Sequence, residues 1–185
     1  SVILSKLFPN AQLVTIDLPV SDEVFISSYG RESSAEEFAQ QRDAVIEQLP
    51  NTNFLALNSV NLSKWNEEQF DLIWVDGAHG YPVVAIDLVN AYRIAREGAY
   101  VLVDDVETVP RPAKKADKMY SSMASFEVLN EFARSELISD FTLFLKRVHP
   151  KYNVRRYTET LPWLLRCGLA RDSSKEIGMF IKEHR

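Results

Sequence analysis

Four residues near the middle of the chain carry side chains that could do chemistry together. Asp76 and His79 follow one apolar run, and Asp104 and Asp105 end the next apolar run. Carboxylates that converge at one place repel one another and raise each other's pKa unless a cation lies among them. Hard oxygen ligands suit Mg²⁺ or a similar ion. We therefore hypothesise a metal site formed by Asp76, Asp104 and Asp105.

His79 lies three positions beyond Asp76, close enough to serve the same site. An imidazole is a suitable general base near neutral pH, so His79 is a candidate for removing a proton from a substrate. The alternative is structural: Asp76 and His79 would order the turn and cap the helix that begins at Pro82. Both interpretations stay open at this point.

A second group of polar residues follows the earlier strands. Asp17 ends the run QLVTID. Asn58 ends the run NFLALN, and Ser59 is the residue after it. Open α/β sheets bind ligands at the carboxyl ends of their strands. A carboxylate at that place can accept hydrogen bonds from two neighbouring hydroxyls. The alternatives are a loop acid that caps Ser21 or Asp22, and a turn-forming role for Asn58 and Ser59.

Short apolar runs alternate along the chain with longer helical segments, which predicts an α/β fold. The expected sheet is doubly wound and mostly parallel, with the last two strands as an antiparallel pair. The predicted helices are Val2–Phe8, a helix opened by capping boxes at Ser33 and Ser34 that runs to about Leu49, a helix from Pro82 closed by Gly98 as its C′ residue, and Ser122–Leu137. The predicted strands are Gln12–Asp17, Asn53–Asn58, Phe70–Asp76, Ala99–Asp104, Phe141–Lys146 and Gly178–Lys182.

Length and composition favour one globular domain. The 185 residues, 46% hydrophobic and 25% charged, are expected to form a single domain over 1–185, with an insertion at 148–176 between the last two strands. The single cysteine predicts a reducing, cytoplasmic location, and no apolar run approaches the ~20 residues that cross a bilayer. The net charge of −5 disfavours a nucleic-acid backbone as the partner.

The stretch FDLIWVDGAHGYPVVAIDLVNAYRIAREGAYVLVDD at Phe70–Asp105 resembles the fourth strand, following helix and fifth strand of class I S-adenosylmethionine-dependent methyltransferases. TIDLP at Thr15–Pro19 resembles the end of that family's second strand, and ALNSV at Ala56–Val60 the end of its third. The acids after the two middle strands resemble those of catechol-type O-methyltransferases, in which a basic residue takes the place of His79.

The resemblance implies a Rossmann-like sheet and S-adenosylmethionine as cofactor, with Mg²⁺ as a second candidate. It implies that Asp17 binds the cofactor ribose and that Asn58 and Ser59 lie at the adenine. It also implies contact between the cofactor and the Asp76–Gly77 turn. His79 would be the catalytic base, and Asp76, Asp104 and Asp105 the metal ligands.

One feature of the family is not found in the chain. The six glycines are Gly30, Gly77, Gly80, Gly98, Gly168 and Gly178, and none forms a G-x-G turn after a strand. Because Val2–Phe8 reads as the helix that follows this turn, we expect the domain to be N-terminally incomplete, with a strand and a glycine-rich turn upstream of Ser1.

The leading functional hypothesis is methyl transfer from S-adenosylmethionine to a hydroxyl of a small molecule. Two alternatives remain: a catalytically idle methyltransferase-like binding module, and a nicotinamide-dependent Rossmann oxidoreductase. The expected partner is a small-molecule substrate, with no nucleic acid and no membrane, and a homo-oligomer stays open.

Overall fold

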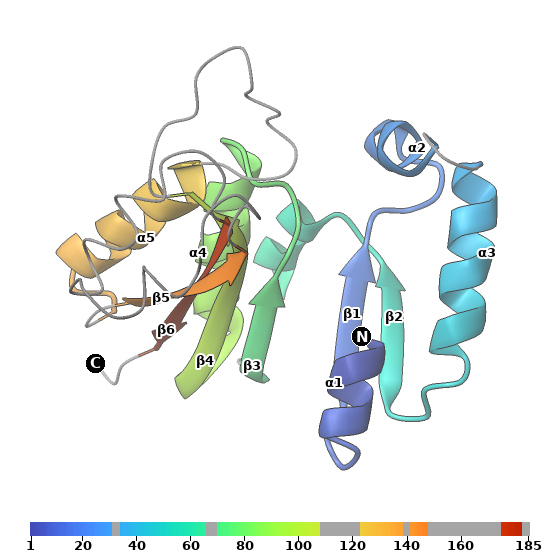
Figure 1. Ribbon diagram of the computed structural model, residues 1–185, viewed down its shortest axis with the longest axis horizontal. Coiled ribbons are helices and arrows are strands. Elements are labelled where there is room, and N and C mark those ends of the chain that lie inside the picture. Colours follow the sequence, from blue (N-terminus) through green and yellow to red (C-terminus); the bar gives the residue numbers. More distant parts are fainter. Residues whose placement is uncertain (31–33, 66–69, 108–122, 139–140, 148–174, 183–185) are drawn as a thin grey trace. The chain divides into compact units, whose positions relative to one another are not determined.

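A computed structural model of the protein describes residues 1–30, 34–65, 70–107, 123–138, 141–147 and 175–182 (Figure 1). The chain divides into two compact units, Ser1–Lys64 and Trp65–Arg185, called here the N-terminal and the C-terminal unit. Each is described by itself. That residues 1–185 form a single domain stays a prediction.

The N-terminal unit is built on two parallel strands. Strand β1 pairs with β2 in a register that sets Leu13 beside Thr52 and Asp17 beside Ala56. Parallel strands end at the same edge of a sheet, so Asp17 and the residues after Ala56 share the carboxyl edge. The elements in chain order are α1 (Val2–Leu7), β1 (Leu13–Asp17), α2 (Glu23–Tyr29), α3 (Ala35–Ile46), β2 (Thr52–Ala56) and the 3₁₀ helix η1 (Ser59–Lys64).

Helix α3 begins where the sequence predicts. The Ser34 hydroxyl accepts the Glu37 N–H, and the Glu37 carboxylate accepts the Ser34 N–H, which completes a capping box. Ala35 and Ala39 are the buried residues of this helix, and Phe38 is partly buried against them, whereas Val45 is 44% exposed.

Helix α2 was not predicted. It begins after Asp22, whose carboxylate accepts the Val24 N–H. Phe25 of this helix is fully buried and forms a small core with Ala35 and Ala39 of α3. The signal in the sequence is the acidic pair Asp22-Glu23 at a helix start, a position where acidic side chains satisfy free N–H groups.

The C-terminal unit carries a four-stranded mixed sheet in the order β3-β4-β6-β5. Strands β3 and β4 are parallel neighbours, as predicted, and β6 lies antiparallel between β4 and β5, which confirms the closing antiparallel pair. The elements are β3 (Phe70–Val75), α4 (Val83–Ile94), β4 (Ala95–Val106), α5 (Met123–Arg134), β5 (Phe141–Arg147) and β6 (Lys175–Ile181).

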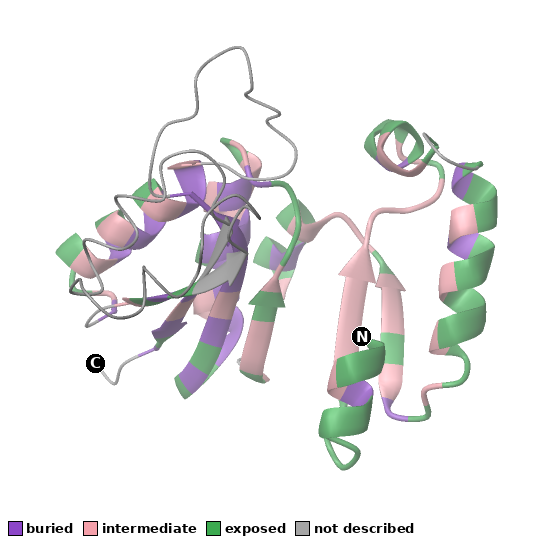
Figure 2. Ribbon diagram, in the orientation of Figure 1, coloured by how far each residue is buried: buried purple, intermediate pink, exposed green. Residues whose placement is uncertain are grey.

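The core of this unit lies between one face of the sheet and helices α4 and α5. Val101 and Val103 of β4 are almost fully buried, and they share a core cluster with Leu88 of α4, Leu129 of α5 and Phe180 of β6. Figure 2 shows this burial along β4, in contrast to β1, which is intermediate throughout. The buried core holds the carboxyl ends of β3 and β4 in place.

The predicted end of helix α4 is wrong. The helix ends at Ile94, and Gly98 lies inside strand β4 with φ +76° instead of following the helix as its C′ residue. The cause is pairing with the end of β6: the Gly98 N–H donates to the Lys182 carbonyl, and the Lys182 ammonium donates to the Ala95 carbonyl. These contacts draw Ala95–Gly98 into the strand.

The predicted insertion at 148–176 falls mainly on residues outside those described, and its last two positions belong to β6, which begins at Lys175. Within the described ranges, no helix has the length and apolar character needed to span a membrane.

Candidate active site

The C-terminal unit brings His79 and Asp105 together at the carboxyl edge of β3 and β4. The His79 Nε2 lies 4.0 Å from the Asp105 Oδ2, and both side chains are buried. Asp105 has φ +49°, a left-handed backbone conformation that turns the chain at this point of β4. The distance is longer than that of a hydrogen bond, but a protonated imidazole at this place would be attracted to the carboxylate.

Asp76 and Asp104 lie at the same edge of the sheet, because each comes directly after one member of the register pair Val75 and Val103. Asp76 is exposed and Asp104 is buried. The Asp104 Oδ1 accepts the backbone N–H of Asp105 at 2.8 Å. This hydrogen bond uses one acceptor position of the Asp104 Oδ1.

The predicted metal site is not supported by this geometry. No group of three or more His, Cys, Asp and Glu side chains suited to a metal ion occurs among the residues that the structure describes. Asp104 accepts the N–H of the next residue in its own strand, and Asp105 lies nearest to His79. We therefore derive no step that uses Mg²⁺.

The structural alternative for Asp76 and His79, in which they order the turn and cap helix α4, stays a prediction. Helix α4 begins at Val83 after Pro82, one residue later than predicted, and its N-cap residue Pro82 makes no side-chain capping hydrogen bond.

Gly77 lies in the turn between β3 and α4, next to buried Asp87. A Cβ atom at this position would lie 3.1 Å from the Asp87 Oδ2, which is closer than ordinary van der Waals contact. The glycine thus leaves room for a carboxylate of α4 beside the turn. Contact between the Asp76–Gly77 turn and a cofactor stays a prediction.

The N-terminal unit places Asp17 at the carboxyl edge of β1, as predicted. Its Oδ1 accepts the Leu18 N–H at 2.8 Å, and its Oδ2 lies 3.4 Å from the Arg42 Nη1. The alternative role, capping Ser21 or Asp22, is not what these contacts show. Both oxygens of the carboxylate are held by the protein.

Asn58 and Ser59 follow β2 at the same edge, since Asp17 and Ala56 are register partners and the Leu57 N–H donates to the Asp17 carbonyl. The Asn58 Oδ1 accepts the Val60 N–H at 3.0 Å, so the turn-forming role of Asn58 is present. Contact with an adenine stays a prediction for both residues.

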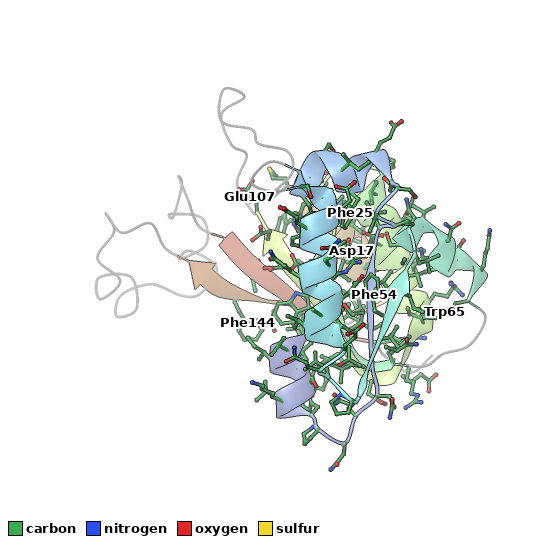
Figure 3. The ribbon with its side chains drawn as sticks, turned by 90° about the vertical axis from the view of Figure 1, so that its right-hand side faces the viewer. Asp17, Phe25, Phe54, Trp65, Glu107 and Phe144 are labelled. Atoms are coloured by element: carbon green, nitrogen blue, oxygen red, sulfur yellow. The ribbon has the colours of Figure 1, made fainter. Side chains whose placement is uncertain are left out.

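Sequence reasoning missed Arg42, the residue of α3 that faces Asp17. Figure 3 labels Asp17, Phe25 and Phe54, which come from β1, α2 and β2 and lie along α3. The available signal was spacing: Arg42 follows Phe38 by four residues, on the helix face that carries the buried Ala39. A charged residue on a buried helix face needs a partner.

Comparison with known proteins gives a family and a fold. The family model described as a methyltransferase domain matches residues 2–106. No curated protein matches the chain significantly. Among solved structures, the N-methyltransferase NodS from Bradyrhizobium japonicum WM9 is 14% identical with a TM-score of 0.52, over 97% of this chain and 79% of that one.

An O-methyltransferase family protein from Burkholderia thailandensis is 9% identical with a TM-score of 0.56, over 97% of this chain and 46% of that one. At such identities these likenesses show the fold alone: a Rossmann-like α/β fold, as predicted. The family model covers more than half of the chain and matches the segment that carries Asp17, His79 and Asp105. The chain therefore belongs to the methyltransferase-domain family, within the class I S-adenosylmethionine-dependent methyltransferases.

Proposed function

We propose that the protein transfers the methyl group of S-adenosylmethionine to a hydroxyl of a small molecule, with His79 as general base. The observation that carries the proposal is the buried pair of His79 and Asp105, with 4.0 Å between Nε2 and Oδ2, at the carboxyl edge of β3 and β4. Ligands of open α/β sheets bind at this edge.

The proposed step moves one proton and one methyl group. The acceptor oxygen forms a bond to the methyl carbon while the carbon–sulfur bond breaks and its electron pair stays on sulfur, which leaves S-adenosylhomocysteine. His79 takes the hydroxyl proton. The Asp105 carboxylate stabilises the resulting imidazolium, and the attraction between the two charges is stronger at a buried site than in water. Positioning of the acceptor supplies the rest of the rate.

On the cofactor side, we propose that Asp17 accepts hydrogen bonds from the two ribose hydroxyls. Its place at the end of β1 supports this role, and so does the fixed carboxylate that the Leu18 N–H and Arg42 hold. Asn58 and Ser59 would lie at the adenine, and the Asp76–Gly77 turn would contact the cofactor, as the family resemblance implies.

The experiment is mass spectrometry of the purified full-length protein, followed by transfer assays with phenols, alcohols and amines. Retained S-adenosylmethionine or S-adenosylhomocysteine, with a mass gain on hydroxyl acceptors, is the expected result. Transfer to amines alone would contradict the hydroxyl acceptor. A retained cofactor with no transfer to any acceptor would favour the idle binding module, and a retained nicotinamide dinucleotide would favour the oxidoreductase.

A further inference from the structure

Arg42 of α3 is a charged side chain placed against aromatic rings in the N-terminal unit. Its side chain is 14% exposed. The guanidinium carbon lies 4.0 Å from the centre of the Phe54 ring and 5.6 Å from that of the fully buried Phe25. A guanidinium at this distance is attracted to the face of the ring. Phe54 therefore gives the plane of the guanidinium a defined position beside β2.

From this position the guanidinium reaches two carboxylates. Its Nη1 lies 3.4 Å from the Asp17 Oδ2, and its Nε donates to the Asp43 Oδ1 at 2.8 Å. Only a planar fork with several N–H donors can stack on a ring and face two acids at once. A lysine ammonium is a point charge and would lose one of these contacts. The arrangement therefore depends on arginine as such.

The Asp17 carboxylate is fixed from both sides by these contacts. Leu18 donates its N–H to Oδ1 at 2.8 Å, and Arg42 approaches Oδ2. An ionised carboxylate oxygen accepts about two hydrogen bonds, so each oxygen keeps about one acceptor position. Two acceptor positions on a carboxylate that does not rotate match the two O–H donors of a vicinal diol. Without Arg42, the carboxylate would be held through Oδ1 alone.

We infer that Arg42 is a positioning residue for the cofactor ribose and acts through Asp17. The inference rests on the proposed function, in which Asp17 binds the ribose hydroxyls. Preorganised acceptors bind more tightly because no ordering is needed when the ligand arrives. The side chains of Arg42 and Asp17 are only 14% and 25% exposed, so loss of Arg42 also lowers stability, and an effect on the ribose contact is separated from it by an analogue without ribose hydroxyls.

The test measures the affinity of the full-length protein for S-adenosylhomocysteine and for its 2′,3′-dideoxy analogue, which lacks both ribose hydroxyls. Arg42→Met and Arg42→Lys should each weaken binding of S-adenosylhomocysteine, by about tenfold for Arg42→Met, and leave binding of the dideoxy analogue unchanged. In an Asp17→Asn background, Arg42→Met should cause no further loss. Arg134→Met, which removes an exposed ion pair with Glu131 on α5, is the matched control and should change neither affinity.

Three results would overturn the inference. If the Arg42 variants lost the same affinity for both ligands, Arg42 would be a structural residue only. The same would follow if Arg42→Met weakened binding of S-adenosylhomocysteine in the Asp17→Asn background as much as it does in the unchanged protein. Unchanged affinity in Arg42→Lys and Arg42→Met would remove any role. If the protein without substitutions binds no S-adenosylhomocysteine, the proposed function itself is wrong. This outcome is measured on the unchanged protein alone, so it is distinct from a failure of the inference about Arg42.

Discussion

At the residue scale, the site depends on which groups each carboxylate faces. Asp104 and Asp105 are neighbours in sequence and both are buried, yet Asp104 accepts a backbone N–H and Asp105 faces His79. The left-handed backbone of Asp105 separates their directions. The two adjacent acids therefore have different partners, and the proposed catalytic pair is Asp105 with His79.

We expect His79→Ala to lower kcat by about 10²–10⁴-fold, because the proton of the acceptor then has no base within reach. Asp105→Asn should lower kcat less and leave cofactor affinity unchanged, since the base remains and loses only the charge that stabilises its protonated form. The measurement is steady-state transfer kinetics, with Glu97→Gln on the exposed part of β4 as control. The activity of the unchanged enzyme should be the same with and without excess chelator. A loss of activity in chelator that Mg²⁺ restores would revive the metal hypothesis.

A second prediction at this scale concerns Tyr81, in the turn before α4. Burial, a hydrogen bond to Glu127, and the negative charges of Glu127 and Glu131 raise the pKa of the phenol above its ordinary value of 10.0. Because the folded-state pKa is the higher one, the stabilising contribution is fully present below pH 10.0 and is lost as the pH rises through the folded value.

Glu127→Gln should therefore lower the pKa of Tyr81 toward 10.0, since it removes the charge beside the phenol. The measurement is the phenolate absorbance of each protein minus that of its Tyr81→Phe counterpart, which isolates this residue among the seven tyrosines. An unchanged midpoint would show that Glu127 does not interact with the phenol.

At the element scale, the antiparallel strand β6 closes the sheet through a glycine. A Cβ atom at Gly178 would lie 2.9 Å from the Leu129 Cδ1 of α5 and 3.4 Å from the Val106 Cγ2 of β4. Both neighbours are fully buried, so the helix can approach the sheet here only because residue 178 has no side chain. Glycine at this position sets the packing of α5 on the strands.

Gly178→Ala should lower the free energy of unfolding by about 1–3 kcal/mol through overpacking. Leu129→Ala in the same chain should remove most of that added cost, because it makes room for the new methyl group. Gly98→Ala is the control: no atom lies within 4 Å of its Cβ position, but its φ of +76° makes the substitution strained for another reason. Its cost should not change with Leu129→Ala. Denaturant unfolding measures all of these variants, and additive effects at Gly178 and Leu129 would contradict the packing argument.

At the scale of the whole molecule, the chain holds two units, each with a pair of parallel strands that end in candidate site residues. Asp17, Asn58 and Ser59 lie at the carboxyl edge in the N-terminal unit, and Asp76, His79 and Asp104 at the carboxyl edge in the C-terminal unit. Each unit by itself thus meets the rule that ligands of α/β sheets bind at this edge.

A ligand that binds only the folded protein raises its stability. S-adenosylhomocysteine at a hundred times its Kd should raise the free energy of unfolding of the full-length protein by about 2.7 kcal/mol. NAD at the same concentration should cause no change, because the chain belongs to a methyltransferase family. Thermal unfolding with each ligand measures the difference, and stabilisation by NAD in place of S-adenosylhomocysteine would contradict the proposed function.

The amino-acid sequence by itself determined the features that depend on residues close together in the chain. Alternating apolar runs predicted β1, β3 and the antiparallel β6, and the Ser34 capping box predicted the start of α3. The acids at strand ends and the segment from Phe70 to Asp105 indicated the methyltransferase family. Local periodicity and capping chemistry act over a few residues, so they can be read without a fold.

Only the tertiary structure decided which partner each side chain meets. Arg42 reaches Asp17 across 25 residues, and Lys182 pairs with Ala95 across 87, which extends β4 back to the end of α4. The different partners of the Asp104 and Asp105 carboxylates likewise appear only in the fold, at the left-handed residue near the end of β4. Contacts between distant residues depend on strand register and helix packing, and no local pattern in a single sequence specifies these.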